Sequence, residues 1–161
     1  MNKHQPYRLW VFLSILLSLV ALSLQNQSQL AQSLPYWPWM VVMFWALTMP
    51  TRINIGTAFI VGLLCDSLLA QPIGLFALLF SISAYFMTVL SAHYKGLPIA
   101  QQSLYVGIIY ACVHLSSDVF LHTLRSDMPF EWNLWPVGIA LISWGVIQHS
   151  LERFARITPI E

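Results

Sequence analysis

The chain has 161 residues, of which 58% are hydrophobic and only 8% are charged, and its net charge is +1. Soluble domains carry about 25% charged residues, so this composition excludes most soluble enzyme classes, and the absence of a basic patch argues against nucleic-acid binding. A transmembrane helix needs about 20 apolar residues, and six candidate spans leave no room for an appended soluble domain.

Six continuous apolar stretches follow one another along the chain. We expect membrane-spanning helices over about residues 7–25, 36–50, 53–70, 73–92, 99–122 and 134–151. The stretch at 36–50 is short, so it must be tilted, extended at its ends or matched by a thinner bilayer. The prediction is an all-α, polytopic membrane protein with one integral membrane domain over residues 1–161 and six helices in one bundle.

The first stretch has the basic start of a signal peptide, but its apolar core is longer than a typical signal core of about 7–15 residues. We therefore expect an uncleaved membrane anchor. Further along the chain, Pro72 and Gly74 predict a tight reversal between the third and fourth helices. Asn54 is placed to cap the start of the third helix.

Positive charges indicate the orientation. If the N-terminus is cytoplasmic, the cations on the inner side are Lys3, Arg8, Arg52, Lys95, Arg153 and Arg156. Only Arg125 falls on the outer side. Because Lys and Arg accumulate on the cytoplasmic side of membrane proteins, both termini are predicted to be cytoplasmic.

Tryptophan residues gather near the predicted helix ends. Trp37, Trp39, Trp132 and Trp135 are expected at the outer membrane–water interface, and Trp10 at the inner one. Aromatic side chains are enriched at both interfaces, so we interpret these residues as interfacial anchors.

The two cysteines, Cys65 and Cys112, both fall inside predicted helices. A disulfide would require those helices to pack closely, and nothing in the sequence demonstrates this. We expect both to be buried thiols that act as small apolar residues.

Two acidic residues, Asp66 and Asp118, fall inside predicted spans. Ionisable residues are costly within a membrane and are functional candidates there. Each lies four residues before the outer end of its span, about 6 Å below that end at 1.5 Å per residue. The two carboxylates could face one polar spot between helices, or each could reach the interface separately.

A second polar group combines His114, Asp118 and His122, which are spaced to share one helix face. Imidazole and carboxylate groups are zinc ligands, so these residues are weak metal candidates. The interpretation we favour is a helix-packing face on which His and Asp hydrogen-bond each other and neighbouring helices. Contact with a partner is the second option. No nucleophile, metalloprotease or phosphate-loop motif is present, so we predict no enzyme activity and no cofactor.

One stretch is similar to a known family. Its residues are Pro50-Thr-Arg52-Ile-Asn54-Ile-Gly56-Thr57, Phe59-Ile-Val-Gly62-Leu63-Leu-Cys-Asp66, Gly74-Leu-Phe-Ala77 and Tyr85. They resemble the bacterial rod shape-determining protein family MreD, most strongly over about Pro35–Tyr85. The family often has Pro-Asn where this chain has Pro35-Tyr36.

The resemblance implies a non-enzymatic inner-membrane subunit of the machinery that elongates rod-shaped cells. The implied partners are an MreC-like bitopic protein, the actin-like MreB, the lateral-wall synthase and transpeptidase, and membrane lipids. Residues expected to bind partners or support the fold are Arg52, Asn54, Gly56, Gly62, Asp66, Gly74 and Asp118.

Two other functions stay open from the sequence. Six helices can enclose a cavity, which would suit the substrate-binding subunit of a vitamin-like transporter. A metal- or proton-coupled carrier built on His114, Asp118 and His122 is the weaker option, because carriers often contain internal repeats and none is evident here.

Overall fold

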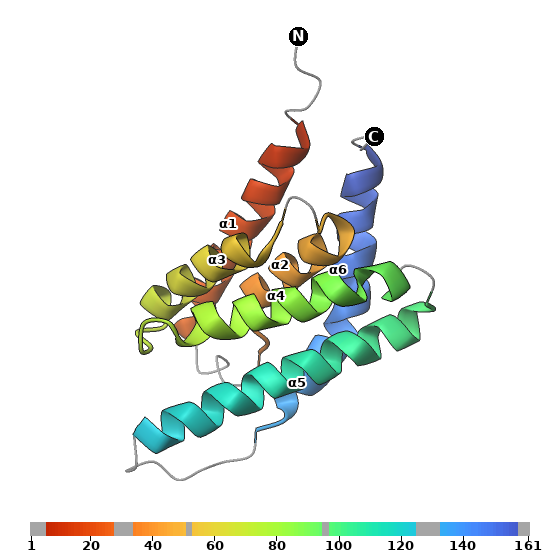
Figure 1. The fold of residues 1–161 in the computed structure, drawn as a ribbon. Helices are drawn as coiled ribbons and strands as arrows, with labels where there is room; N and C mark the ends of the chain where they lie inside the picture. Colours follow the sequence, from red (N-terminus) through yellow and green to blue (C-terminus); the bar gives the residue numbers. More distant parts are fainter. Residues whose placement is uncertain (1–5, 28–33, 51–52, 95–96, 125–132, 158–161) are drawn as a thin grey trace.

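The computed structural model describes residues 6–27, 34–50, 53–94, 97–124 and 133–157. Within these ranges the chain forms helices and no strands (Figure 1). They are α1 (Pro6–Asn26), α2 (Trp37–Thr48), α3 (Ile55–Leu68), α4 (Leu75–Tyr94), α5 (Ile99–Leu124) and α6 (Trp135–Ile157). The predicted all-α class and the six predicted helices are confirmed in the described residues.

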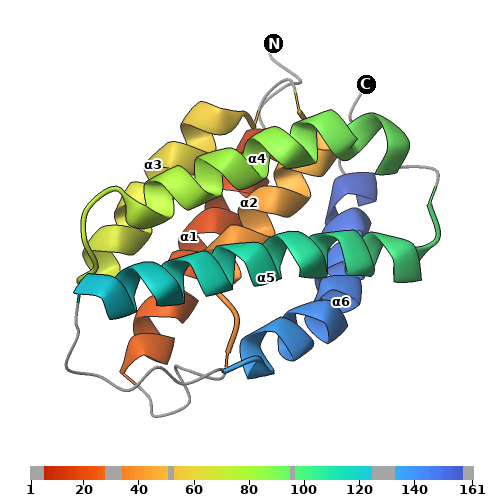
Figure 2. The same ribbon diagram turned by 60° about the horizontal axis from the view of Figure 1, so that its bottom comes forward.

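Helix α2 forms the centre of the molecule. Every residue from Pro38 to Leu47 except Val41 is buried, and α2 contacts α1, α3, α4 and α6. Figure 2 shows α2 enclosed by its neighbours. A helix that is apolar on all sides belongs in a core. With 12 residues, α2 is about 18 Å long, shorter than the stretch predicted at 36–50.

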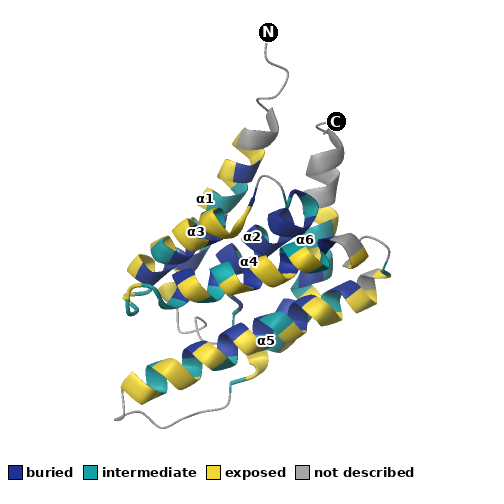
Figure 3. Cartoon of the chain, viewed as in Figure 1, coloured by how far each residue is buried: buried dark blue, intermediate teal, exposed yellow. Residues whose placement is uncertain are grey.

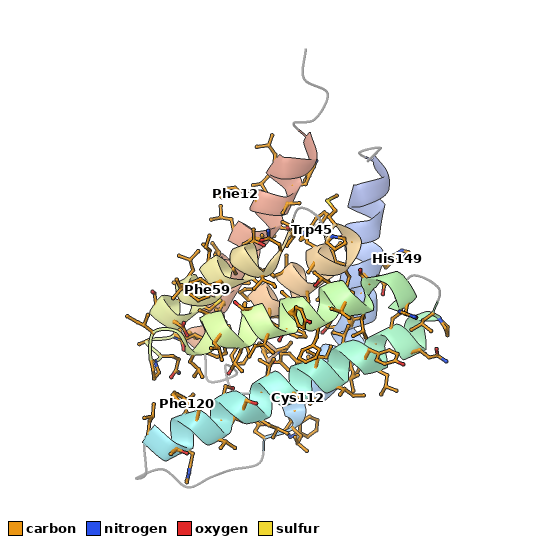
Figure 4. The ribbon with its side chains drawn as sticks, viewed as in Figure 1. Phe12, Trp45, Phe59, Cys112, Phe120 and His149 are labelled. Carbon is orange, nitrogen blue, oxygen red and sulfur yellow. The ribbon has the colours of Figure 1, made fainter. Side chains whose placement is uncertain are left out.

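The surrounding helices have apolar outer faces. Figure 3 shows exposed positions along α1, α3, α4, α5 and α6, and large hydrophobic residues occupy many of them. In Figure 4, Phe12, Phe59 and Phe120 lie on three of these helices, and all three side chains are exposed. Soluble proteins rarely expose continuous apolar surface of this extent. An apolar exterior around an apolar core is the arrangement expected in lipid.

In the part of the chain that the structure describes, two helices are long and apolar enough to cross a membrane, judged by length and composition. These segments are Leu9–Asn26 and Ala100–Leu124. Shorter apolar segments are Trp37–Thr48, Ile55–Leu68 and Leu75–Ser91. Helix α1 begins and α6 ends at the same end of the molecule (Figures 1 and 2).

Helices α3 and α4 form a closely packed antiparallel hairpin (Figure 1). A Cβ atom added at Gly62 would lie 2.5 Å from Ala77 Cα and 2.6 Å from Phe76 O. Both neighbours are backbone atoms, so they have little freedom to move aside. The glycine therefore sets the distance between the two helices.

We predict that Gly62→Ala destabilises the protein by about 1–3 kcal/mol, because the added methyl group forces two packed backbones apart. The measurement is reversible unfolding in detergent micelles. Gly138→Ala is the matched control, since an added Cβ at Gly138 meets nothing within 4 Å. Equal stability of the two variants would contradict this account of the hairpin.

Candidate functional site

Asp66 lies in the last turns of α3 and is fully buried. Ala58, Gly62 and Asp66 follow one another at intervals of four residues, so they share one face of the helix. All three are buried. The small side chains at positions 58 and 62 allow α4 to approach this face, and its first turn then lies beside the Asp66 carboxylate.

The Asp66 carboxylate accepts hydrogen bonds from three backbone N–H groups at the start of α4. Oδ1 accepts from Phe76 N at 2.8 Å, and Oδ2 accepts from Gly74 N at 2.9 Å and from Ala77 N at 3.3 Å. The first N–H groups of a helix have no partner within the helix, and the positive end of the helix dipole favours an anion there. Asp66 thus caps α4 from the neighbouring helix.

The turn between α3 and α4 is built around residues with positive φ. Ala70 has φ 49° and Gly74 has φ 104°. The Gln71 N–H group donates to the Asp66 carbonyl oxygen at 3.0 Å, so α3 ends in a left-handed cap. Glycine adopts positive φ without strain, and this conformation presents the Gly74 N–H group to Asp66.

We name the group of Gly62, Asp66, Gly74 and the N–H groups of Phe76 and Ala77 the hairpin clamp. The resemblance had suggested three of these residues for a partner-binding or structural role, and the structure brings them together. Gly62 sets the helix spacing and Asp66 fixes the start of α4.

Tyr36, the residue before α2, organises a second polar group. Its N–H group donates to the Tyr110 hydroxyl at 3.1 Å. The Tyr36 ring lies 4.8 Å from the Phe76 ring, edge to face, and 6.1 Å from the His114 ring, nearly parallel to it. These contacts join the start of α2 to α4 and α5.

His114 and Asp118 form a close pair on α5. His114 Nδ1 lies 2.8 Å from Asp118 Oδ2, a distance typical of an ion pair, although the two atoms are not aligned for a hydrogen bond. The His114 side chain is 7% exposed and that of Asp118 is 29% exposed. We name Tyr36, Tyr110, His114 and Asp118 the tyrosine–histidine cluster.

The two acidic residues therefore have separate partners. Asp66 is bound by α4, whereas Asp118 pairs with His114 and is partly exposed. Phe76 links the two groups, because its N–H group binds Asp66 and its ring contacts Tyr36. The alternative in which both carboxylates face one polar spot is not what the structure shows.

No group of three or more His, Cys, Asp or Glu side chains is placed to hold a metal ion in the part of the chain that the structure describes. His114 and His122 lie on the same helix, but they do not form such a group with Asp118.

The other predicted site residues, Asn54, Gly56 and Arg52, do not belong to the hairpin clamp or to the tyrosine–histidine cluster. Asn54 caps α3, because its Oδ1 accepts from Gly56 N at 3.1 Å and from Thr57 N at 3.4 Å. Gly56 is exposed, and the nearest atom to an added Cβ would be Asn54 Oδ1. Arg52 lies outside the described residues.

Two predictions from residue type were wrong. Trp39, predicted as an interfacial anchor, has no exposed surface and lies 5.1 Å from the Tyr110 ring. Cys112, predicted to be buried, is exposed, whereas Cys65 is buried as expected. Both thiols are free. The roles of Tyr36 and Phe76 were missed, and the only sequence signal for Tyr36 is its place after Pro35 at the start of an apolar helix.

The family model described as rod shape-determining protein MreD matches residues 3–149. The chain is also similar to the rod shape-determining protein MreD of Haemophilus influenzae, with 31% identity over 112 residues that cover 63% of this chain and 68% of the relative. No solved structure matches the chain.

We predict that Asp66→Ala destabilises the fold by several kcal/mol, because each buried N–H group left without a partner costs about 1–3 kcal/mol. Asp66→Asn is expected to cost less, since its single carbonyl oxygen replaces part of the carboxylate. Unfolding in detergent micelles measures both effects. Ser67→Ala is the control, because Ser67 is exposed and its hydroxyl donates to the Leu63 carbonyl oxygen of its own helix. If Asp66→Ala were as stable as Ser67→Ala, the hairpin clamp would have no structural role.

Proposed function

Because the chain belongs to the MreD family of rod shape-determining proteins, we propose that it acts as a multi-pass scaffold in the bacterial inner membrane. In this role it carries out no catalysis and helps rod-shaped cells keep their shape. It does so by holding other components of the elongation machinery together. The single observation that carries the proposal is the match of the family model to almost the whole chain.

The proposed topology has six membrane-crossing helices and both termini in the cytoplasm. Three observations support it. Six of the seven Lys and Arg residues fall on one side of the predicted spans. Helix α1 begins and α6 ends at the same end of the molecule (Figure 1). The surrounding helices carry exposed apolar side chains.

The proposed partners are an MreC-like bitopic protein, the actin-like MreB, and the synthase and transpeptidase of the lateral wall. With so little mass outside the apolar helices, the protein has mainly helix faces and short loops to offer them. In a membrane, close packing and a few fixed polar groups drive helix association. A helix face with a fixed shape is therefore the expected means of recognition.

We propose that the α3–α4 hairpin is the face that a partner's transmembrane helix recognises. Its tip exposes Leu64, Leu68, Ile73 and Leu78, and Ile73 is 83% exposed. The hairpin clamp belongs to the same segment of the chain, where Asp66 accepts a hydrogen bond from the Gly74 N–H group. The clamp would hold the apolar side chains in the arrangement that the partner contacts.

Complementation of a depleted rod-shaped strain tests this function. Wild type and Ser67→Ala should restore rods, whereas Asp66→Ala should leave rounded cells and lose co-purification of the MreC-like protein at an equal membrane level. Unaltered rod shape after depletion, together with a nutrient-uptake defect, would contradict the scaffold and favour a transport role. Unchanged complex formation in both Asp66→Asn and Asp66→Ala would contradict the role of the clamp.

A surface variant separates recognition from folding. Ile73→Ala should weaken co-purification about tenfold, which corresponds to about 1.4 kcal/mol, without lowering stability. Ile142→Ala is the matched control, because Ile142 is 79% exposed on α6, away from the hairpin. Equal partner binding by both variants would exclude the hairpin tip as the contact surface.

A further inference from the structure

The outward side of α5 carries polar side chains at intervals along its length. Exposed residues follow one another there at spacings of three or four positions, so they share one side of the helix. We name them the α5 stripe: Gln101, Tyr105, Ile108, Cys112, Ser116, Val119 and Thr123. The spacing of four, three and four residues occurs twice, which keeps the stripe nearly straight along the helix. Cys112 is its central member and lies midway along α5 (Figure 4).

The α5 stripe lies opposite the internal contacts of its helix. Tyr110 and His114 are buried and contact the residue before α2. The buried Gly107 faces α6, because a Cβ atom added there would lie 2.1 Å from Leu141 Cδ2. With 3.6 residues per turn, these three residues are turned about 140–160° away from Cys112. The stripe therefore remains on the outer surface of the molecule.

The outer face of α1 shows what a surface suited to lipid looks like, because every exposed residue within Leu9–Leu24 is hydrophobic. The α5 stripe differs from it. The hydroxyl groups of Tyr105 and Ser116 make no hydrogen bond within the part of the chain that the structure describes, whereas those of Ser117 and Thr123 donate to carbonyl oxygens of α5. A polar group without a partner is costly in hydrocarbon. Contact with another helix, which can supply partners, therefore suits the stripe better than lipid.

The chemistry of the stripe is complementary to itself. It contains no Asp, Glu, Lys or Arg, so two copies can meet without repulsion between like charges. Hydroxyl and amide groups both donate and accept hydrogen bonds, so the same group on a second copy is a suitable partner. The small side chains of Cys112 and Ser116 allow two helices to approach closely at the middle of the stripe. In a two-fold dimer, residues near the axis face their own copies.

We propose that the α5 stripe is the contact surface between two copies of this chain, related by a two-fold axis that is perpendicular to the membrane and passes beside Cys112. This inference rests on the proposed membrane embedding. It uses a different helix from the α3–α4 hairpin, so self-association and partner recognition depend on separate surfaces. The dimer gives the scaffold two hairpin surfaces in one assembly.

Oxidative cross-linking of the full chain in lipid vesicles tests the contact. Cys65→Ala leaves Cys112 as the single thiol, and copper phenanthroline is the oxidant. The control lacks both natural cysteines and carries Leu17→Cys, because Leu17 is 71% exposed on α1. A disulfide requires closely placed Cα atoms, so we expect Cys112 to form a linked dimer about fivefold faster than the control. Equal rates in the two proteins, or a yield from Cys112 that falls in proportion as lipid is added, would overturn the proposal.

A second measurement does not depend on the thiol. Subunits labelled at the N-terminus are counted in vesicles by single-molecule photobleaching. Ser116→Leu should lower the dimer fraction about threefold or more, because it removes a hydroxyl group and separates the helices. Val146→Leu is the control, since Val146 is 66% exposed on α6. A parent chain that is monomeric at every lipid dilution but restores rod shape would overturn the dimer alone, whereas a dimeric chain that fails to restore rods would contradict only the scaffold.

Discussion

The carboxylate of Asp66 is the group on which the arrangement of α3 and α4 depends. Burying a charge away from water is costly unless hydrogen bonds compensate for it, and the first N–H groups of a helix are equally costly when they lack partners. In this protein the buried carboxylate and the unpaired N–H groups satisfy each other, because the carboxylate accepts hydrogen bonds from three N–H groups at the start of α4. The hydrogen bonds thus offset the free-energy cost of burying both the carboxylate and the N–H groups among apolar side chains.

The effect of this contact extends to the rest of the molecule through Phe76. Its N–H group is held by Asp66 and its ring by Tyr36, and Tyr36 in turn binds Tyr110 on α5. The central helix α2 begins directly after Tyr36. The start of the central helix and the nearby turns of α4 and α5 are therefore tied to the same carboxylate, although only α3 and α4 contact it directly.

Hydropathy was sufficient to predict the helices, since each observed helix lies close to an expected span. Asp66 was singled out because it is an acid inside a predicted span, and Gly74 because it forms a turn with Pro72. Gly62 was singled out by the family resemblance. The donors to Asp66 were not predictable. Every residue except proline has a backbone N–H group, so the sequence does not show which of these groups bind the carboxylate. The predictions for Trp39 and Cys112 were wrong for a related reason. Residue type alone does not tell whether a side chain lies at the membrane interface, in the core or on the outer face of a helix.

The central claim is that Asp66 fixes the geometry of the α3–α4 hairpin. After Cys65 and Cys112 are replaced by alanine, spin labels at the exposed positions Leu64 and Ile82 measure the distance between the two helices directly. The account predicts one narrow distance in the parent protein and in Ser67→Ala, and a broadened or displaced distribution in Asp66→Ala. The same narrow distance in Asp66→Ala would contradict it.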